Sequence, residues 1–239
     1  MNNVELPFIR EMFDAIAPKY DFLNRSLSLY QDVIWRRRAI ASLKLGKGTG
    51  KSVLDVACGT CDMAIEALRQ TKGRVRVIAT DFSYNMLTLG STKVEKEPDG
   101  GKISLVQGNG LALPGRDNTY DAVTIAFGIR NIMDRKGALS EFVRCLKPGG
   151  RVAVLELTTP EQKFLRGLYL LYFQKVLPVI GGLFSKNRGA YSYLPDSVLN
   201  FPSRRDFEKI MTDAGFEEVR SRPMTFGIVT LFTGKKGDA

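Results

Sequence analysis

The chain contains no histidine among its 239 residues, and it has only three cysteines and one tryptophan. Without histidine it cannot form a histidine-based zinc site, a Ser-His-Asp triad or a Cys-His pair. We therefore expect no metal centre. Any proton acceptor in this protein has to be a carboxylate, a tyrosine, a lysine or water.

An uninterrupted apolar segment is also missing. Glu5, Arg10 and Glu11 interrupt the first apolar residues, so the N-terminus does not resemble a secretory signal. Residues 164–184 form a run long enough to cross a bilayer, but the run contains charges such as Lys175 near its middle, where they are costly. We expect a cytoplasmic protein that can lie peripherally at the inner face of the membrane.

The chain has fewer acidic than basic residues, 25 Asp and Glu against 35 Lys and Arg, which gives a formal net charge of +10. Such a surplus attracts polyanions, either nucleic acid or an anionic membrane surface. A nucleic-acid-binding module would interleave aromatic residues with Lys and Arg on one exposed face. The densest aromatic run, residues 164–184, is apolar instead. We expect an anionic membrane surface as partner and no nucleic acid, and the sequence leaves a homo-oligomer open.

From residue 51 onward, short β-branched runs alternate with helix-length amphipathic stretches, a pattern typical of an α/β fold with a parallel sheet and helices on both faces. A hydrophobic share of 44% suffices for a full core, and we expect one domain. Residues 6–43 have apolar positions at helical spacing and predict one or two helices ahead of it. The strands are expected at residues 52–57, 75–79, 103–106, 122–126 and 151–157.

Turn residues mark two further boundaries. Residues 146–150, Leu-Lys-Pro-Gly-Gly, predict a connection from a helix to the strand that starts at residue 151. Ser203 followed by Asp206 predicts a capped helix that runs to Ala214 and stops at Gly215. Two strand-like runs beyond it predict a hairpin added to the sheet.

The first predicted strand runs into Cys58-Gly59-Thr60-Cys61-Asp62, a tight turn at the place where α/β folds bind ligands. A dinucleotide site needs a third glycine, where this chain has Ala64, and the Asp62 carboxylate would repel a diphosphate. S-adenosylmethionine has no phosphate but carries an ammonium and a sulfonium. The turn, which lies between Asp55 and Asp62, therefore favours that cofactor, with Gly59 among its expected contacts.

Two later strand ends complete the expected cofactor site. Asp81 follows the second strand, where a carboxylate can accept hydrogen bonds from both ribose hydroxyls of an adenosine. The loop 108–110 follows the third strand, and Asn109 could pair with the exocyclic amine of adenine. Each signal is weak alone, but three in order on successive strands make a strong prediction.

The sequence resembles the class I methyltransferases and, more closely, the ubiquinone/menaquinone biosynthesis C-methyltransferase family over nearly its whole length. The match is carried by FDAIAPKYDFLNRSLS from Phe13, VLDVACGT from Val53, TDFSYNML from Thr80, FGIRN from Phe127, LKPGG from Leu146 and AYSYLPDSVLNFP from Ala190. The second and fifth segments are generic to methyltransferases, whereas the first, fourth and sixth are typical of this family.

The resemblance implies a Rossmann-like class I methyltransferase with a mostly parallel seven-stranded sheet and a helical lid insertion. It also implies that Thr60, Asp81, Asn109 and Gly110 contact the cofactor. There are departures from the family pattern: Cys61 replaces a glycine, Asn109-Gly110 replaces Asp-Ala, and the histidine before Trp-Arg-Arg is missing. The first departure could strain the turn or weaken cofactor binding.

By resemblance, the expected activity is conversion of the lipid-soluble demethylmenaquinol to menaquinol with S-adenosylmethionine. The alternatives are methylation of a benzoquinol in ubiquinone biosynthesis, methylation of both rings, or a non-catalytic cofactor- or nucleic-acid-binding module. Cys58 and Cys61 also form a Cys-x-x-Cys pair, so a redox role is a minor alternative.

Methylating a ring carbon requires electron density at that carbon, which an ionised hydroquinone supplies. We expect Arg130 to hydrogen-bond the ionised oxygen and Asn131 to orient it or a water. The alternative is that Arg130 pairs with a neighbouring acid such as Asp134. With histidine absent, the proton leaves to water or to a group of the N-terminal segment, where Tyr20 is our candidate beside the carboxylates Asp14 and Asp21. These three residues could equally be helix anchors.

We expect residues 1–45 to form a helical segment that packs on the substrate pocket, ahead of a methyltransferase domain over residues 46–239. A lid-like insertion is expected at about residues 160–202. Its apolar part, residues 164–184, is either an ordinary core helix pair or a lid that shelters an isoprenoid tail and dips into the membrane surface. We favour the lid.

Overall fold

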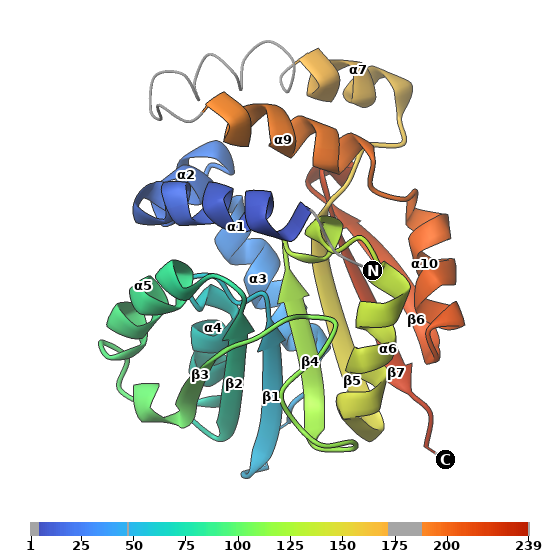
Figure 1. Cartoon of the computed structure of the whole chain (residues 1–239). Coiled ribbons are helices and arrows are strands. Elements are labelled where there is room, and N and C mark those ends of the chain that lie inside the picture. Colours follow the sequence, from blue (N-terminus) through green and yellow to red (C-terminus); the bar gives the residue numbers. More distant parts are fainter. Residues whose placement is uncertain (1–4, 47, 172–187, 239) are drawn as a thin grey trace.

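The computed structural model describes residues 5–46, 48–171 and 188–238 of the chain. Its centre is a seven-stranded sheet with the order β3-β2-β1-β4-β5-β7-β6 (Figure 1). The strands are β1 (Lys51–Val56), β2 (Val75–Asp81), β3 (Ile103–Gln107), β4 (Tyr120–Ala126), β5 (Leu146–Leu157), β6 (Phe216–Met224) and β7 (Val229–Lys236).

Parallel pairing joins the first five strands, and β7 enters antiparallel between β5 and β6. The expected mostly parallel seven-stranded sheet and its C-terminal hairpin are thus confirmed. Because β1 to β5 all run in one direction, their carboxyl ends meet at one edge, the upper edge in Figure 1. The loops that follow β1, β2, β3 and β4 therefore lie close together.

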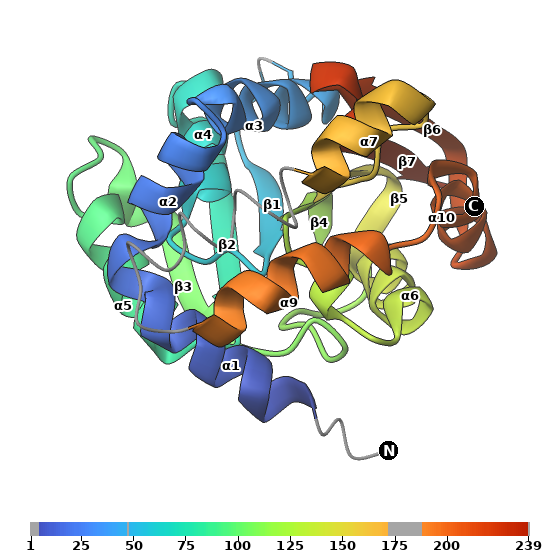
Figure 2. The same cartoon turned by 90° about the horizontal axis from the view of Figure 1, so that it is seen from above.

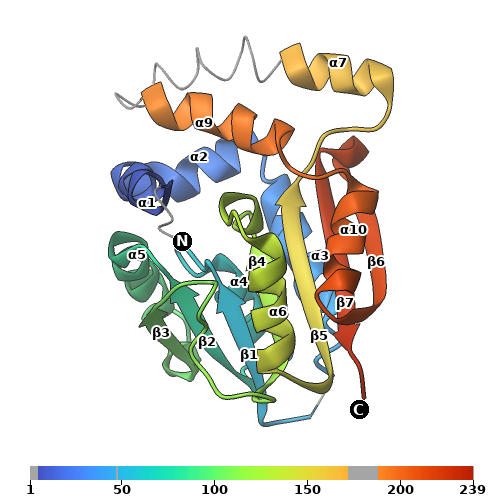
Figure 3. The same ribbon diagram turned by 45° about the vertical axis from the view of Figure 1, so that its right-hand side comes forward.

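Helices cover both faces of the sheet, which alternates its side chains between two cores. Figure 3 shows α6 and α10 on one face of the sheet and α3 behind it. Val53 and Val77 belong to the core beneath α3, α4 and α5, whereas Leu54 and Val56 belong to the core beneath α6 and α10. The helices are α1 (Glu5–Ile16), α2 (Tyr20–Leu27), α3 (Gln31–Ser42), α4 (Asp62–Thr71), α5 (Tyr84–Val94), α6 (Arg135–Cys145), α7 (Lys163–Leu171), α9 (Arg188–Leu199) and α10 (Arg204–Asp213).

The N-terminal segment contains more helices than the sequence predicted. Three α-helices and a 3-10 turn (Ala17–Lys19) occupy it, instead of one or two helices. The helix α2 ends before Leu29 and Tyr30, which both have left-handed backbone angles, with φ of +50° and +62°. Apolar periodicity continues through this turn, and for this reason the break was not visible in the pattern.

The predicted connection at residues 146–150 is part of a strand. The strand β5 begins at Leu146, directly after α6, and its pairing with β4 jumps from Tyr120↔Leu146 to Ala122↔Arg151. The intervening residues bulge out of the ladder, with Gly149 at φ +73°. The predicted helix cap is confirmed, because the Ser203 hydroxyl accepts a hydrogen bond from the Asp206 N–H at the start of α10.

The upper edge of the sheet is covered by α1, α2, α7 and α9 (Figures 1 and 2). The apolar run at residues 164–184 is described only as far as Leu171, so its remainder lies outside the described residues. Among the helices that the structure describes, none has the length and apolar character needed to cross a membrane.

Candidate active site

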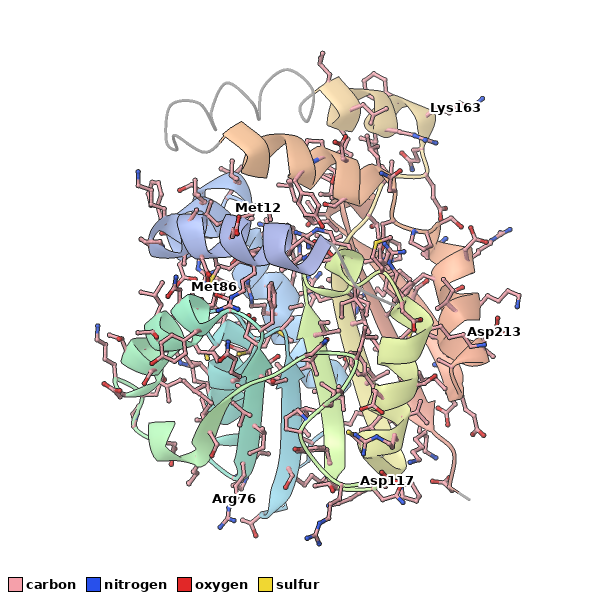
Figure 4. All side chains as sticks on the ribbon, viewed as in Figure 1. Met12, Arg76, Met86, Asp117, Lys163 and Asp213 are labelled. Carbon is pink, nitrogen blue, oxygen red and sulfur yellow. The ribbon has the colours of Figure 1, made fainter. Side chains whose placement is uncertain are left out.

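Two adjoining cavities lie at the upper edge of the sheet. The smaller has a volume of about 70 Å³ and the larger about 490 Å³, and Phe13, Tyr20 and Phe127 stand in the walls of both. Met86 lines the small cavity and Met12 the large one; both lie toward this end of the molecule, whereas Arg76 and Asp117 lie at the other (Figure 4). The small cavity contains four of the predicted cofactor residues: Gly59, Asp81, Asn109 and Gly110.

Asp81 lies at the end of β2, and 5% of its surface is exposed. One carboxylate oxygen accepts from the Gly59 N–H at 2.8 Å and the other from the Ser83 N–H at 2.9 Å. Burial raises the pKa of Asp81, against these backbone donors, which lower it. Each oxygen keeps a further lone pair, so the carboxylate can also accept hydrogen bonds from a ligand in the small cavity.

The turn after β1 contains an unusual backbone position. Cys61 has φ +69° in the left-handed region, where glycine is normally favoured, and it is fully buried directly before α4. Gly90 on α5 makes room for its side chain, because a Cβ at position 90 would lie 2.6 Å from the Cys61 sulfur. The Cys61 side chain in the turn thus packs directly against the backbone of a glycine on the facing helix.

The Cys58 and Cys61 sulfurs lie 4.0 Å apart, and both thiols are free. Burial, together with the neighbouring Cys61 thiol, raises the pKa of Cys58 well above its usual value. A reactive thiol needs the opposite shift. The geometry therefore favours a structural role for the pair.

Asp62, in the first turn of α4, is the centre of a network of ion pairs. Its carboxylate contacts Arg25 at 2.7 Å and Lys93 at 2.6 Å, and Arg36 approaches to 3.7 Å. Burial alone would raise the pKa of Asp62, but Arg36, Lys93 and Arg25 outweigh it and lower the pKa to about 2. The three cations offset the charge of this carboxylate, and with it the repulsion of a diphosphate that the sequence predicted.

The same network anchors the N-terminal helices to the turn between β1 and α4, residues 57–61. Asp32 on α3 pairs with both Arg25 and Arg36, so α2 and α3 are linked to each other and to α4. Lys93 on α5 also pairs with Asp21 on α2 at 2.7 Å. The network thus spans four helices around one turn.

Thr60 and Asp21 belong to this anchoring network. The Thr60 hydroxyl donates to Asp21 at 2.6 Å, and neither residue lines a cavity. Asp14 accepts a hydrogen bond from the Ser83 hydroxyl and likewise lines neither cavity. The structure therefore places the two candidate carboxylate proton acceptors in contacts that hold α1 and α2.

Asn109 and Gly110 lie in the loop after β3. The Asn109 side-chain oxygen accepts from the Leu111 N–H at 3.0 Å, which shapes the loop. A Cβ at Gly110 would lie 3.0 Å from Ile132, so the absence of a side chain at this position lets the backbone pack close to Ile132 in the wall of the small cavity. An oxygen that already accepts one hydrogen bond can accept a second from an amine.

Arg130 follows β4 and lines the large cavity, although only 8% of its surface is exposed. Its guanidinium donates to Glu156 at 2.9 Å, and its backbone N–H donates to the other oxygen of the same carboxylate at 3.1 Å. The alternative that Arg130 pairs with a neighbouring acid is therefore confirmed, but the acid is Glu156 and not Asp134, which caps α6 by accepting from the Gly137 N–H. The Arg130 Nε is buried and has no partner among the described residues.

Tyr20 and Asn131 lie between the two cavities. Tyr20 lines both, and burial raises its pKa despite the nearby cations Arg36 and Arg130. Its neutral phenol is therefore favoured at neutral pH, which makes it a hydrogen-bond donor. Asn131 lines the small cavity, and its side-chain oxygen accepts from the hydroxyl of Tyr193, which lines the large one, at 3.0 Å.

The large cavity has mainly apolar walls. Trp35 and Phe127 pack edge to face with ring centroids 6.2 Å apart, and the Trp35 N–H donates to the Thr225 hydroxyl at 2.9 Å. The volume of the large cavity lies within the roughly 300–1,000 Å³ typical of ligand sites. The aliphatic part of the wall is contributed by Ile16, Leu23, Leu27, Leu157, Leu165, Leu168, Leu194 and Ile228.

Sequence reasoning did not identify Glu156 or Asp32 as parts of the site. Glu156 is fully buried, and it was the one charged residue in the apolar run of β5, so it was a detectable signal. A carboxylate inside a buried strand requires a partner, but the sequence does not say which. Asp32 lies next to Trp35 in a helix that the apolar pattern did not separate from its neighbours.

The match between Cys61 and Gly90 can be tested by exchanging the two residues. Gly90→Ala alone places a Cβ against the Cys61 sulfur and should destabilise the protein by about 1–3 kcal/mol. Adding Cys61→Gly removes the sulfur and the left-handed strain, so the double variant should recover most of the loss. Chemical denaturation of the four proteins measures this coupling. Losses that simply add would show that the two positions are independent.

The sequence matches the ubiE/COQ5 methyltransferase family over residues 1–236. It is 51% identical over 229 residues to the ubiquinone/menaquinone biosynthesis C-methyltransferase UbiE of Geobacter sulfurreducens, covering 96% of this chain and 88% of that protein. It is 42% identical to the demethylmenaquinone methyltransferase of Bacteroides fragilis, covering 95% and 92%.

Among solved structures, a SAM-dependent methyltransferase from Aquifex aeolicus has the same fold, with a TM-score of 0.60 at 18% identity, covering 84% of this chain and 88% of that one. This likeness supports the Rossmann-like class I architecture of the sheet and its flanking helices. The family match over almost the whole chain, at the identities found, goes further than the fold. The chain belongs to the ubiE/COQ5 methyltransferase family and is a methyltransferase.

Proposed function

We propose that this protein uses S-adenosylmethionine to methylate a ring carbon of demethylmenaquinol, giving menaquinol. The observation that carries the proposal is the pairing of two unlike cavities: a small one with a buried carboxylate, and a large apolar one with a buried arginine. The names of the Geobacter and Bacteroides relatives support quinone C-methylation as the chemistry. Such a quinol is lipid-soluble, so we also propose a membrane surface as partner.

The residues of the small cavity fit an adenosyl cofactor. Asp81 offers carboxylate oxygens for the ribose hydroxyls, and Asn109 and Gly110 offer an amide and open backbone for the adenine edge. A volume of about 70 Å³ is small for such a group, so the walls of the small cavity have to move apart when it binds. When bound, the cofactor supplies a methyl group on a positively charged sulfur.

The residues of the large cavity suit a naphthoquinol. Trp35, Tyr20 and Phe127 provide aromatic surface for the rings. Arg130 is held by Glu156 beside this surface, where its guanidinium can donate to the ionised quinol oxygen. Stabilising that oxygen keeps electron density on the adjacent carbon, which is the atom that takes the methyl group.

Tyr20 and Asn131 are proposed to orient the same oxygen. Because burial raises the pKa of Tyr20, its phenol acts as a donor and not as the initial proton acceptor. Asn131 is positioned by its hydrogen bond with Tyr193 at the boundary of the two cavities. Two protons have to be accounted for: the hydroxyl proton leaves when the quinol ionises, and the ring carbon that takes the methyl group loses its hydrogen as a proton. One proton returns to the oxygen, so one is released per turnover. Water is the proposed acceptor, since Asp14 and Asp21 line neither cavity.

The proposal is tested by turnover with S-adenosylmethionine and two short-tailed acceptors, a demethylnaphthoquinol and a benzoquinol, each in reduced form. We expect methylation of the naphthoquinol and none of its oxidised quinone, because only the quinol supplies the electron density. Turnover of the benzoquinol alone would assign the protein to ubiquinone biosynthesis, and equal turnover would assign it to both. Cofactor binding without turnover of either acceptor would support the non-catalytic alternative.

Arg130→Ala should lower kcat by about 10²–10³-fold, the usual loss when one donor to a developing oxyanion is removed. Calorimetry should find S-adenosylmethionine affinity unchanged, because Arg130 lines only the large cavity. Arg116→Ala is the matched control, since Arg116 is exposed and lines neither cavity. Near-normal turnover of the Arg130 variant would remove the residue from the mechanism.

Cofactor affinity should weaken as the pH falls. Ionised Asp81 is the better acceptor for ribose hydroxyls, and a cationic ligand nearby stabilises its charge, so binding lowers its pKa. Since burial raises the pKa of the free carboxyl, the loss should begin above the ordinary value near 3.9 and grow as the pH approaches it. Calorimetric titrations across this range measure the slope. Asp81→Asn should bind weakly with a flatter profile; an unchanged slope would assign the effect to another group.

A further inference from the structure

The mouth of the large cavity is surrounded by large apolar side chains that face solvent. Leu29 is 82% exposed, Phe226 is 78% exposed and Leu168 is 51% exposed, and all three line the cavity. Single exposed apolar residues are ordinary, but a group of them around one opening marks an interaction surface. We define the apolar rim as these three residues together with their exposed sequence and helix neighbours Tyr30, Phe164 and Leu171.

Two loops of the apolar rim combine left-handed backbone angles with solvent-exposed apolar side chains. Leu29 and Tyr30 have φ of +50° and +62°, and Thr225 and Phe226 have φ of +45° and +59°. Glycine or asparagine would relieve this strain, yet bulky residues stand at most of these positions. Strain that persists at a ligand-binding loop is a pointer to function.

The two loops are held as one surface. Trp35, on the helix that follows the first loop, donates a hydrogen bond to the Thr225 hydroxyl in the second loop at 2.9 Å. The third contributor to the rim, α7, lies over the same edge of the sheet (Figures 1 and 2). Both loops and α7 contribute walls to the large cavity.

Among the residues that the structure describes, the unpaired charges that α7 contributes to the apolar rim are positive. The helix α7 carries exposed Lys163 and Arg166 and has no acidic residue, and Lys163 projects outward at this end of the molecule (Figure 4). Glu161, just before α7, is exposed but pairs with Arg204. A second copy of the chain would bring the same cations against each other, whereas an anionic lipid surface complements them.

We propose that the apolar rim docks this protein onto an anionic bilayer, with its exposed side chains, Tyr30 and Phe164 among them, inserted among the lipids so that the large cavity opens toward them. This inference rests on the proposed lipid quinol substrate. It adds the surface and the orientation: the upper edge of the sheet faces the membrane, and the opposite edge with Arg76 faces away (Figure 4). Apolar insertion and attraction to anionic lipid together give reversible interfacial binding.

Flotation with two kinds of vesicle tests the docking. We expect the wild-type protein to float with phosphatidylcholine vesicles that contain about 30% phosphatidylglycerol, an anionic surface that attracts Lys and Arg, and to float far less with phosphatidylcholine alone. Tyr30→Ser combined with Phe164→Ser should lower the bound fraction about tenfold, because interfacial affinity scales with buried apolar area. Tyr84→Ser, which removes an exposed aromatic residue on α5 that lines neither cavity and lies outside the apolar rim, is the matched control and should float like wild type.

Turnover of a water-soluble short-tailed quinol separates this inference from the proposed function. Neither Tyr30 nor Phe164 lines the cavity, so the double variant should methylate the soluble quinol normally but lose turnover of a long-tailed quinol in anionic vesicles. A wild-type enzyme that methylates the soluble quinol but ignores anionic vesicles would overturn the docking alone. A variant that floats like wild type would also overturn it, as would a concentration-dependent dimer that the double variant abolishes.

Discussion

Asp62 gathers three cations from three different helices, and the upper part of the molecule depends on that gathering. Arg25 comes from α2, Arg36 from α3 and Lys93 from α5, and Asp62 is the first residue of α4, directly after the turn that follows β1. Taking ions out of water costs several kcal/mol each unless every charge finds partners. Here the second carboxylate, Asp32, completes the set. Such a network fixes where α2 and α3 sit, which apolar contacts alone specify poorly.

The position of those helices decides what the cavities can do. Tyr20 and Phe13 stand in the walls of both cavities only because α1 and α2 are held across the upper edge of the sheet. Secondary contacts follow the same logic: Thr60 donates to Asp21, and the Ser83 hydroxyl donates to Asp14. Polar residues in the turn after β1 and in the loop after β2 thus hold α1 and α2 in place. For this reason, the sequence motifs alone did not distinguish residues that line a cavity from residues that support its walls.

Much of the fold followed from local chemistry. The alternation of β-branched runs with amphipathic stretches, and the Ser203 cap, depend on interactions within a few residues, and they predicted the sheet and the last helix correctly. The break at Leu29 and Tyr30 and the bulge before Arg151 depend on tertiary contacts that override the local pattern. In the candidate site, the place of Asp81 at the end of a strand could be predicted from the sequence, whereas Glu156 as the partner of Arg130 depends on the pairing of β4 with β5.

Arg130 and Glu156 show how the two halves of the site differ physically. Glu156 is fully buried and accepts from the Arg130 guanidinium, from the Arg130 backbone and from the Leu157 N–H, so the pair is fixed before any ligand arrives. A donor that needs no reorganisation stabilises developing negative charge most effectively. The small cavity has the opposite charge, because it is lined by the Asp81 carboxylate, which suits a cationic ligand. On the proposed reaction the charges of the methyl donor and the ionised acceptor cancel on transfer, and the ring carbon then loses its hydrogen as a proton to water. This route needs an arginine to hold the acceptor but no histidine as a base, which accords with a chain that has no histidine.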